Sequence, residues 1–168
     1  MKKGLLALAA SVCLLAGQVN AKTIVEIAAD DERFSTLVAA VQAAGLQDAL
    51  QGPGPFTVFA PVNDAFAALP EGTVETLLKP ENKGQLTNVL LYHVDDRKLT
   101  SKQIPMGSNY FKPMLTSERT CITRSGKGVG IADGSGATAN VIIADIQAEN
   151  GVIHVIDKVL LPGQRPSC

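Results

Sequence analysis

A run of β-branched residues that begins at an Asn-Gly pair and ends at a proline constrains the fold most strongly. Asn150 and Gly151 open this run, and such a pair is a strong hairpin signal because both residues tolerate positive φ. The residues that follow are mostly Val, Ile and Leu, and Pro162 ends them. The segment therefore predicts a turn followed by a strand in the core of a sheet.

The first half of the chain is expected to be mainly helical. Asp30 or Asp31 can cap a helix that ends at Gly45. A short strand at residues 56–60 then precedes a short helix that Asn63 can cap. The apolar residues of the first of these helices recur at helical spacing: Phe34, Leu37, Val38 and Val41.

The periodicity changes in the second half. A longer helix is expected after Pro80, a residue suited to a first helical turn, and His93 lies on its apolar stripe. From about Tyr110 onward, runs rich in Thr, Val and Ile alternate with glycine-containing turns, which predicts a series of short antiparallel strands. Helices first and strands after them indicate the α+β class.

The first 21 residues have the pattern of a signal peptide. Lys2 and Lys3 precede an apolar stretch that is too short to span a bilayer comfortably, and the residues up to Ala21 fit a cleavage site. We therefore expect residues 1–21 to be removed on export and residues 22–168 to form one domain. An uncleaved membrane anchor is the alternative.

The charge balance argues against a nucleic-acid partner. The chain has 15 basic and 16 acidic residues, and loss of Lys2 and Lys3 leaves 13 basic residues against 16 acidic ones, a net charge of −3. Binding to a phosphate backbone needs clustered Lys and Arg, and the sequence shows no basic stripe. No segment after residue 21 is long and apolar enough to span a membrane.

Three motifs occur in an order that resembles the fasciclin domain family. Residues 56–66, FTVFAPVNDAF, resemble the family's N-terminal motif. Leu91-Tyr92-His93 resembles its Tyr-His motif, and residues 150–162 resemble its C-terminal motif. The resemblance implies an antiparallel β-sandwich or wedge with several helices contributed mainly by the N-terminal half. It also implies an extracytoplasmic adhesion or binding module, and the short signal peptide with a single domain indicates a bacterial member.

The resemblance also suggests a binding site. Asp145-Ile146 matches the Asp-Ile pair that animal members of the family use in integrin-dependent adhesion. Asp145 and Ile146 are therefore the candidate binding residues. The alternative is that Asp145 is a strand residue that reaches solvent near the end of a sheet.

Other polar residues of the motifs are expected to be structural. Asn63 and Asp64 follow a strand and open a helix, so capping is favoured over cation binding. Tyr92 and His93 are expected to support the core, with the His93 ring hydrogen-bonded to a backbone group. A general base or a metal ligand is the alternative for His93. His154 lies in an apolar strand and is expected to be a core or edge histidine, because a metal site would need a carboxylate beside it.

Two cysteines remain after residue 21. Cys121 and Cys168 are expected to form a disulfide, because an exported chain reaches an oxidising compartment. Closing a loop of this length would stabilise the fold by ~4 kcal/mol in the chain-entropy description. Two free thiols are the alternative.

No catalytic signature is present. The chain has no GxSxG elbow, and the glycine run at residues 126–130 lacks the order of a phosphate loop. We expect no enzyme, no cofactor and no metal site. The expected function is an exported, secreted or periplasmic binding module in cell-surface adhesion or extracellular-matrix association, with an unidentified surface or matrix protein or polysaccharide as partner. A periplasmic carrier of a small apolar or lipid-like ligand is the alternative, and it requires a concave apolar pocket.

Overall fold

Helices precede most of the strands along the chain, as the change of periodicity predicts. The computed structural model describes residues 21–168, so the predicted signal peptide lies outside the described residues except for Ala21. No helix within residues 21–168 has the length and apolar character needed to cross a membrane. The helical elements are α1 (Ile24–Ala29), η1 (Glu32–Phe34), α2 (Ser35–Ala44), α3 (Gln47–Leu50), α4 (Asn63–Ala67), α5 (Thr73–Leu78), η2 (Pro80–Asn82) and α6 (Lys83–Tyr92).

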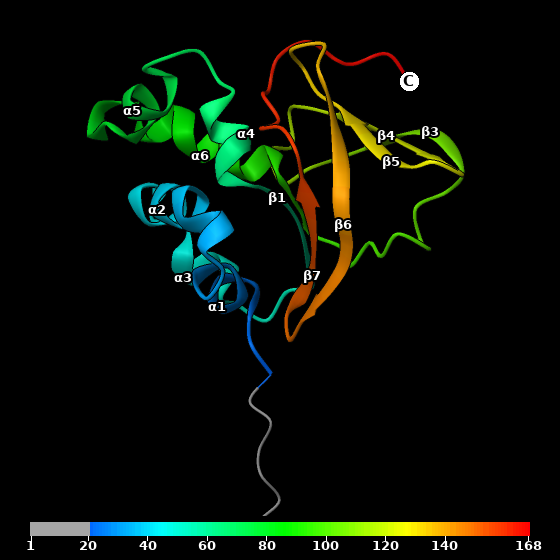
Figure 1. Ribbon diagram of the computed structural model, residues 1–168, viewed down its shortest axis with the longest axis horizontal. Helices are drawn as coiled ribbons and strands as arrows, with labels where there is room; N and C mark the ends of the chain where they lie inside the picture. Colours follow the sequence, from blue (N-terminus) through cyan, green and yellow to red (C-terminus); the bar gives the residue numbers. More distant parts are fainter. Residues whose placement is uncertain (1–20) are drawn as a thin grey trace, which may run out of the picture.

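The strands form one curled seven-stranded sheet in the order β2-β1-β7-β6-β5-β4-β3. In Figure 1 the helices lie on one side of β1 and β7, while β3, β4 and β5 bend away on the other side of β6. The strands are β1 (Phe56–Pro61), β2 (Val94–Asp95), β3 (Gly107–Phe111), β4 (Thr120–Ser125), β5 (Gly128–Ala132), β6 (Thr138–Ala148) and β7 (Gly151–Ile156).

The α+β class is confirmed, and one strand pair differs from the antiparallel expectation. β1 and β7 are parallel, with Phe56 opposite Gly151 and Pro61 opposite Ile156. All the other pairs are antiparallel. Parallel neighbours need a long crossover, and here most of the domain separates the two strands. Local hairpin patterns do not reveal such a pairing.

Two apolar clusters stabilise the two halves of the molecule. The larger one lies between the helices and the β1–β7 part of the sheet, and Phe34 is fully buried in it. The second lies inside the curl of the sheet, where Ile122 and Ile131 are fully buried. Each fully buried side chain of this size contributes roughly 1.5–3 kcal/mol of transfer free energy. Between them the clusters cover β1 and β7 almost completely.

The Asn150–Gly151 pair does join two strands, but not through positive φ angles. Among residues 21–168, neither residue is in the left-handed region. The buried Asn150 side chain instead accepts from the Ile24 N–H at 3.0 Å and donates to the carbonyls of Leu50 at 2.7 Å and Gly52 at 2.8 Å. A Cβ on Gly151 would lie 2.0 Å from the Phe56 carbonyl oxygen. The pair therefore links the helices to the sheet at a point where two backbones nearly touch.

The helix ends match the sequence pattern only in part. Gly45 is left-handed with φ 71° and ends α2, as predicted. Asp31, however, caps the short η1 by accepting from the Arg33 N–H, and α2 begins later, at Ser35. Helix α1, which begins with a capping box between Thr23 and Glu26, is not among the predicted helices. A helix as short as α1 contains too few residues for a helical repeat of apolar positions to be recognised in the sequence.

The predicted disulfide is present between Cys121 of β4 and Cys168, with Cα atoms 5.5 Å apart. It holds the C-terminal segment against the outer strands. The Tyr110 hydroxyl donates to the Pro166 carbonyl at 3.0 Å, and the Arg165 guanidinium lies 4.2 Å from the centre of the Tyr110 ring. The covalent link and these contacts fix the same segment.

Candidate functional site

The middle of β6 is the most irregular part of the sheet. Ile143 pairs with Val155 and Ile146 pairs with Ile153, so residues 144 and 145 oppose the single residue His154. This arrangement is a β-bulge, and bulges occur often beside functional sites. Asp145 has φ 62° and is the one non-glycine residue with positive φ within residues 21–168. Such residues carry backbone strain and are concentrated at functional sites.

The Asp145 side chain, a predicted binding residue with a solvent-reaching strand residue as the alternative, is half-buried. Its Oδ1 accepts from the Ser101 N–H at 2.7 Å, and its Oδ2 accepts from the Ser101 hydroxyl. Partial burial raises the pKa of Asp145, but the two bonds from Ser101, with smaller electrostatic effects of His154 and Lys102, outweigh it and hold the pKa below its usual range. The carboxylate is ionised and already has a partner within the chain.

The other member of the Asp-Ile pair faces inward. Ile146 packs against the apolar cluster under the helices and is only partly accessible. Residues 145 and 146 therefore lie next to each other but do not form one exposed pair. Neighbouring strand residues point to opposite faces of a sheet, and this alternation explains the difference.

Sequence reasoning missed two exposed isoleucines in the same strand. Ile142 is 53% exposed and Ile143 is 38% exposed, although both are large and apolar. The signal was available, because Val141, Ile142 and Ile143 are three successive apolar residues. The register of β6 against β7 also shifts between Val141 and Ile143, so the regular alternation of side chains is interrupted here. We call Ile142, Ile143 and Asp145 the β6 surface.

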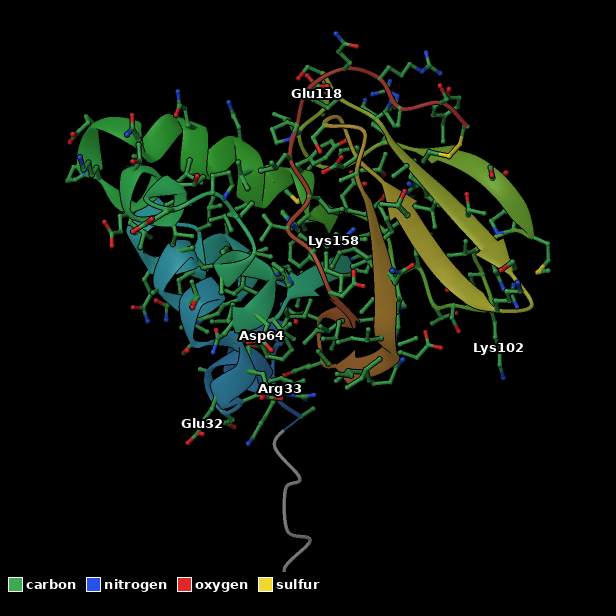
Figure 2. All side chains as sticks on the ribbon, turned by 45° about the horizontal axis from the view of Figure 1, so that its top comes forward. Glu32, Arg33, Asp64, Lys102, Glu118 and Lys158 are labelled. Carbon is green, nitrogen blue, oxygen red and sulfur yellow. A yellow bond between two sulfur atoms is a disulfide. The ribbon has the colours of Figure 1, made fainter. Side chains whose placement is uncertain are left out.

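A charged groove adjoins the β6 surface. Ile142 forms part of its wall, and the charged side chains of Glu32, Arg33 and Asp64 line the rest with Val62 and Asn63. Figure 2 shows Glu32, Arg33 and Asp64 gathered on this side of the molecule. The arrangement places polar groups of both signs beside an exposed apolar ridge.

Asn63 does not cap the helix that it begins. The structure shows no side-chain capping bond for α4, whose N-cap residue is Val62. The Asn63 carbonyl oxygen instead accepts from the Thr36 N–H at 3.0 Å, and its amide donates to the Glu32 carbonyl at 2.8 Å. Asn63 thus provides a hydrogen-bond acceptor for a backbone N–H in the first turn of α2, which has no side-chain cap of its own. Asp64 is exposed at the start of α4.

The Tyr92-His93 pair lies in the interior. The Tyr92 hydroxyl donates to the Arg119 carbonyl at 2.8 Å, and burial raises the pKa of Tyr92. His93 is the C-terminal cap of α6; its Nδ1 lies 2.7 Å from the Val89 carbonyl and its Nε2 accepts from the Leu160 N–H at 2.8 Å. Burial lowers the pKa of His93 to about 4, against weaker opposing effects of the Val89 bond and Asp133. Both ring nitrogens are occupied by the backbone.

His154 is also buried, and its ring stacks on Phe59 with centroids 5.5 Å apart. Its Nε2 lies 2.6 Å from the Leu99 carbonyl, and its Nδ1 accepts from the Asp145 N–H at 3.3 Å. Burial lowers the pKa of His154, opposed by the Leu99 bond and the Asp145 charge. Within residues 21–168, no group of three or more His, Cys, Asp or Glu side chains is arranged to hold a metal ion.

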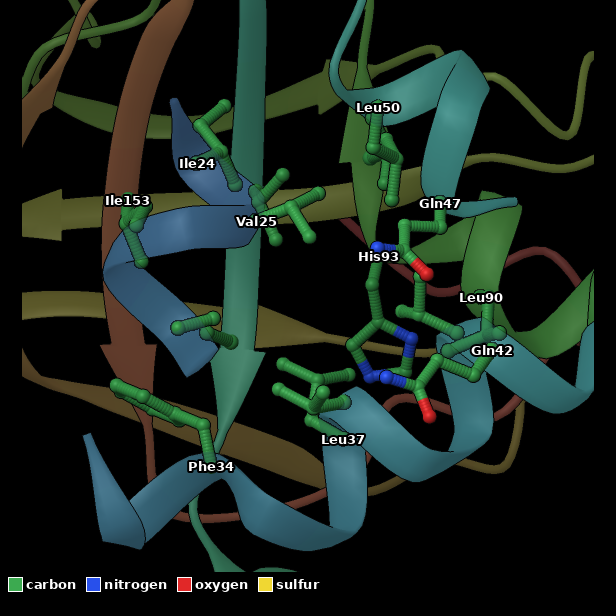
Figure 3. A pocket seen from close by; sticks show the side chains of 16 residues that line it. Ile24, Val25, Phe34, Leu37, Gln42, Gln47, Leu50, Leu90, His93 and Ile153 are labelled. Carbon is green, nitrogen blue, oxygen red and sulfur yellow. The ribbon is translucent and has the colours of Figure 1, made fainter. Parts of the chain in front are cut away.

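An apolar cavity of about 40 Å³ lies between the helices and the sheet. Figure 3 shows Gln42, Gln47 and His93 on one side of it, with Ile24, Val25, Phe34 and Ile153 on the other. Ligand pockets for small organic molecules usually enclose roughly 300–1,000 Å³. The cavity in this conformation has room for little more than a solvent-sized molecule.

Comparisons with known proteins agree with this fold. A sequence profile described as "Fasciclin domain" matches residues 32–162. The chain is 54% identical over 143 residues to protein sll1483 of Synechocystis, covering 85% of this chain and 75% of that protein. It is 40% identical over 140 residues to pig transforming growth factor-beta-induced protein ig-h3, covering 83% of this chain but 19% of that longer protein.

A solved structure gives the same fold at lower sequence identity. The FAS1 domain pair from the insect cell adhesion molecule Fasciclin I superposes with a TM-score of 0.72 at 20% identity, and the match covers 83% of this chain and 51% of that one. The seven-stranded sheet with its helical layer is therefore the architecture of a FAS1 domain. Profile, relatives and architecture together show that the chain belongs to the fasciclin domain family.

Proposed function

We propose that this protein is an exported binding module that acts in cell-surface adhesion or in association with extracellular matrix, and that it binds its partner through the β6 surface. It acts by binding rather than by catalysis. The similarity to a domain pair of an insect cell adhesion molecule supports the adhesive role. The disulfide and the signal-peptide pattern support export, because disulfides persist in oxidising compartments.

The observation that carries the proposal is the exposure of Ile142 and Ile143 beside Asp145. Each isoleucine leaves a third to a half of its surface in water, so covering both would contribute about 1–2 kcal/mol apiece. The charged groove next to Ile142 supplies a polar rim. An apolar centre with a polar, charged rim is the usual anatomy of a protein interface, so the expected partner is a protein of the cell surface or matrix.

An attachment assay tests this surface. Cells of the producing organism, lacking their own copy of the protein, are allowed to attach to surfaces coated with the wild type, Ile142→Asp or Met106→Asp. Met106 is 64% exposed in the bend that precedes β3, away from β6, and is the matched control. We expect attachment to the wild type and to the Met106 variant, and its loss with the Ile142 variant. Equal attachment to all three proteins would show that the β6 surface is not the binding site. Failure of cells to attach to the wild type would contradict the adhesive function.

No structural observation favours the carrier alternative over this proposal. The apolar cavity encloses only about 40 Å³, and both ring nitrogens of His93, one of its lining residues, are already bonded to backbone groups. Mass spectrometry of the protein purified under non-denaturing conditions from its own organism distinguishes the two functions. A stoichiometric apolar ligand would support a carrier and would require this cavity to open.

A further inference from the structure

His154 connects three segments that are distant in the sequence. Its ring belongs to β7, its Nε2 meets the Leu99 carbonyl at 2.6 Å, and its Nδ1 meets the Asp145 N–H of β6 at 3.3 Å. The carboxylate of Asp145 in turn accepts hydrogen bonds from the N–H and the hydroxyl of Ser101, which lies in the same segment as Leu99. The three residues His154, Asp145 and Ser101 close a ring of hydrogen bonds over the β-bulge.

Only one protonation state of His154 fits this ring. A carbonyl oxygen can only accept, so Nε2 must carry the hydrogen that is donated to Leu99. A backbone N–H can only donate, so Nδ1 must be unprotonated to accept from Asp145. A proton added at Nδ1 would place two donors against each other and break this bond.

The backbone of Asp145 depends on that bond. Residues 144 and 145 lie in the bulge and have no paired residue on β7, so a side-chain nitrogen takes the place of the usual ladder partner. Asp145 also holds a left-handed φ of 62°, which is unfavourable for a residue with a Cβ atom. If His154 Nδ1 can no longer accept, the hydrogen bond that keeps the Asp145 backbone in this unfavourable conformation is lost.

We propose that His154, Asp145 and Ser101 form an acid-sensitive latch: protonation of His154 releases the Asp145 backbone, and the carboxylate then separates from Ser101 and becomes free to bind a cationic group of a partner. The latch is a regulatory element of the β6 surface, so its effect on binding rests on the proposed function. Its opening is a property of the chain alone. His154 and Ser101 are positioning residues for Asp145.

The charges around the ring set the direction of the pH response. Asp145 of β6 is the charged group that acts on His154 and favours its protonation, while Lys102 acts on Asp145. Phe59 of β1, which stacks on the ring, is uncharged. Burial is the larger effect and lowers the pKa of His154 in the closed latch. An open latch exposes the ring and restores its ordinary pKa near 6.5. Protons therefore favour the open state, and the latch is closed above about pH 6.5 and weakened below it.

Amide hydrogen exchange measured by NMR tests the opening without any partner. At pH 5.5 an open-state pKa of about 6.5 shifts the equilibrium toward the open state by about tenfold, provided that the closed state stays neutral. We expect the protection factors of the Asp145 and Ser101 amides to fall about tenfold between pH 7.5 and 5.5. Amides of β4 should keep theirs, and His93, whose pKa is about 4, stays neutral in this range.

Two variants distinguish opening of the latch from a general destabilisation of the fold at low pH. Gln in His154→Gln has a donor and an acceptor but does not titrate, so the fall in protection should disappear. Ser101→Ala weakens the hold on the carboxylate, so the NMR-measured pKa of His154 should rise toward 6.5. Constant protection of Asp145 and Ser101 in the wild type would overturn the proposal, as would the same fall in the glutamine variant or an unchanged His154 pKa in Ser101→Ala. Attachment at pH 7.5 is measured separately, so failure of the latch and failure of the adhesive function give different results.

Discussion

Replacing Asn150 by alanine should destabilise this domain more than any surface change of the same size. The Asn150 side chain is 6% exposed and makes three hydrogen bonds, one from the Ile24 N–H and two to the carbonyls of Leu50 and Gly52. The truncation leaves all three groups without a partner. An unsatisfied buried group costs about 1–3 kcal/mol, and water can reach part of the Gly52 region. We therefore expect a loss of about 3–5 kcal/mol in the free energy of unfolding.

Urea unfolding of the purified domain measures this loss. If the slope of the unfolding free energy against urea concentration is unchanged, only the stability has changed. Asn140→Ala is the matched control, because Asn140 is exposed and its amide donates to Asp157 at 2.9 Å. The control should lose less than about 1 kcal/mol. A loss in Asn150→Ala no larger than that of the control would show that the three bonds do not hold the helices to the sheet.

Two further predictions concern protons and covalent links. The pKa of His93 is about 4 in the folded protein and near 6.5 in the unfolded chain, so the unfolded chain binds the proton first and stability falls as the pH drops from about 6.5 to about 4, by about 3 kcal/mol in total. Urea unfolding at pH 7, 5.5 and 4.5 should show this fall, and a His93→Gln variant with the same pH dependence as the wild type would refute it. Removal of the disulfide in a Cys121→Ser, Cys168→Ser double variant should lower the free energy of unfolding by ~4 kcal/mol, since 47 residues separate the two cysteines. An unfolding midpoint equal to that of the oxidised wild type would contradict this second prediction.

The sequence predicts best those features that depend on neighbouring residues. The strand that begins at Gly151 can be predicted because its β-branched residues are consecutive in the sequence. The end of α2 can be predicted because Gly45 readily adopts a left-handed conformation. The disulfide is predictable from compartment and cysteine number alone. Each of these inferences uses a segment of the chain by itself.

The features that the sequence does not predict depend on contacts between distant segments. Asn63 was expected to cap its own helix, yet its side chain bonds to Thr36 on a helix that precedes it in the chain. Asp145 is predicted to bind a partner or to reach solvent, yet its carboxylate bonds to Ser101 within the chain. Nothing in the local pattern around either residue specifies such a partner, because the partner is brought close only by the order of strands in the sheet.

The parallel pairing of β1 with β7 has a consequence for how the chain is made. β7 is the last strand, and it separates β1 from β6 in the sheet. Until residues 151–156 have been synthesised, the apolar faces of β1 and of the first helices have no central strand to pack against. Pairings between such distant segments also form slowly. A partly synthesised chain can therefore form the antiparallel pairs from β3 to β6, but the helices and β1 can join them only when the last strand has been made.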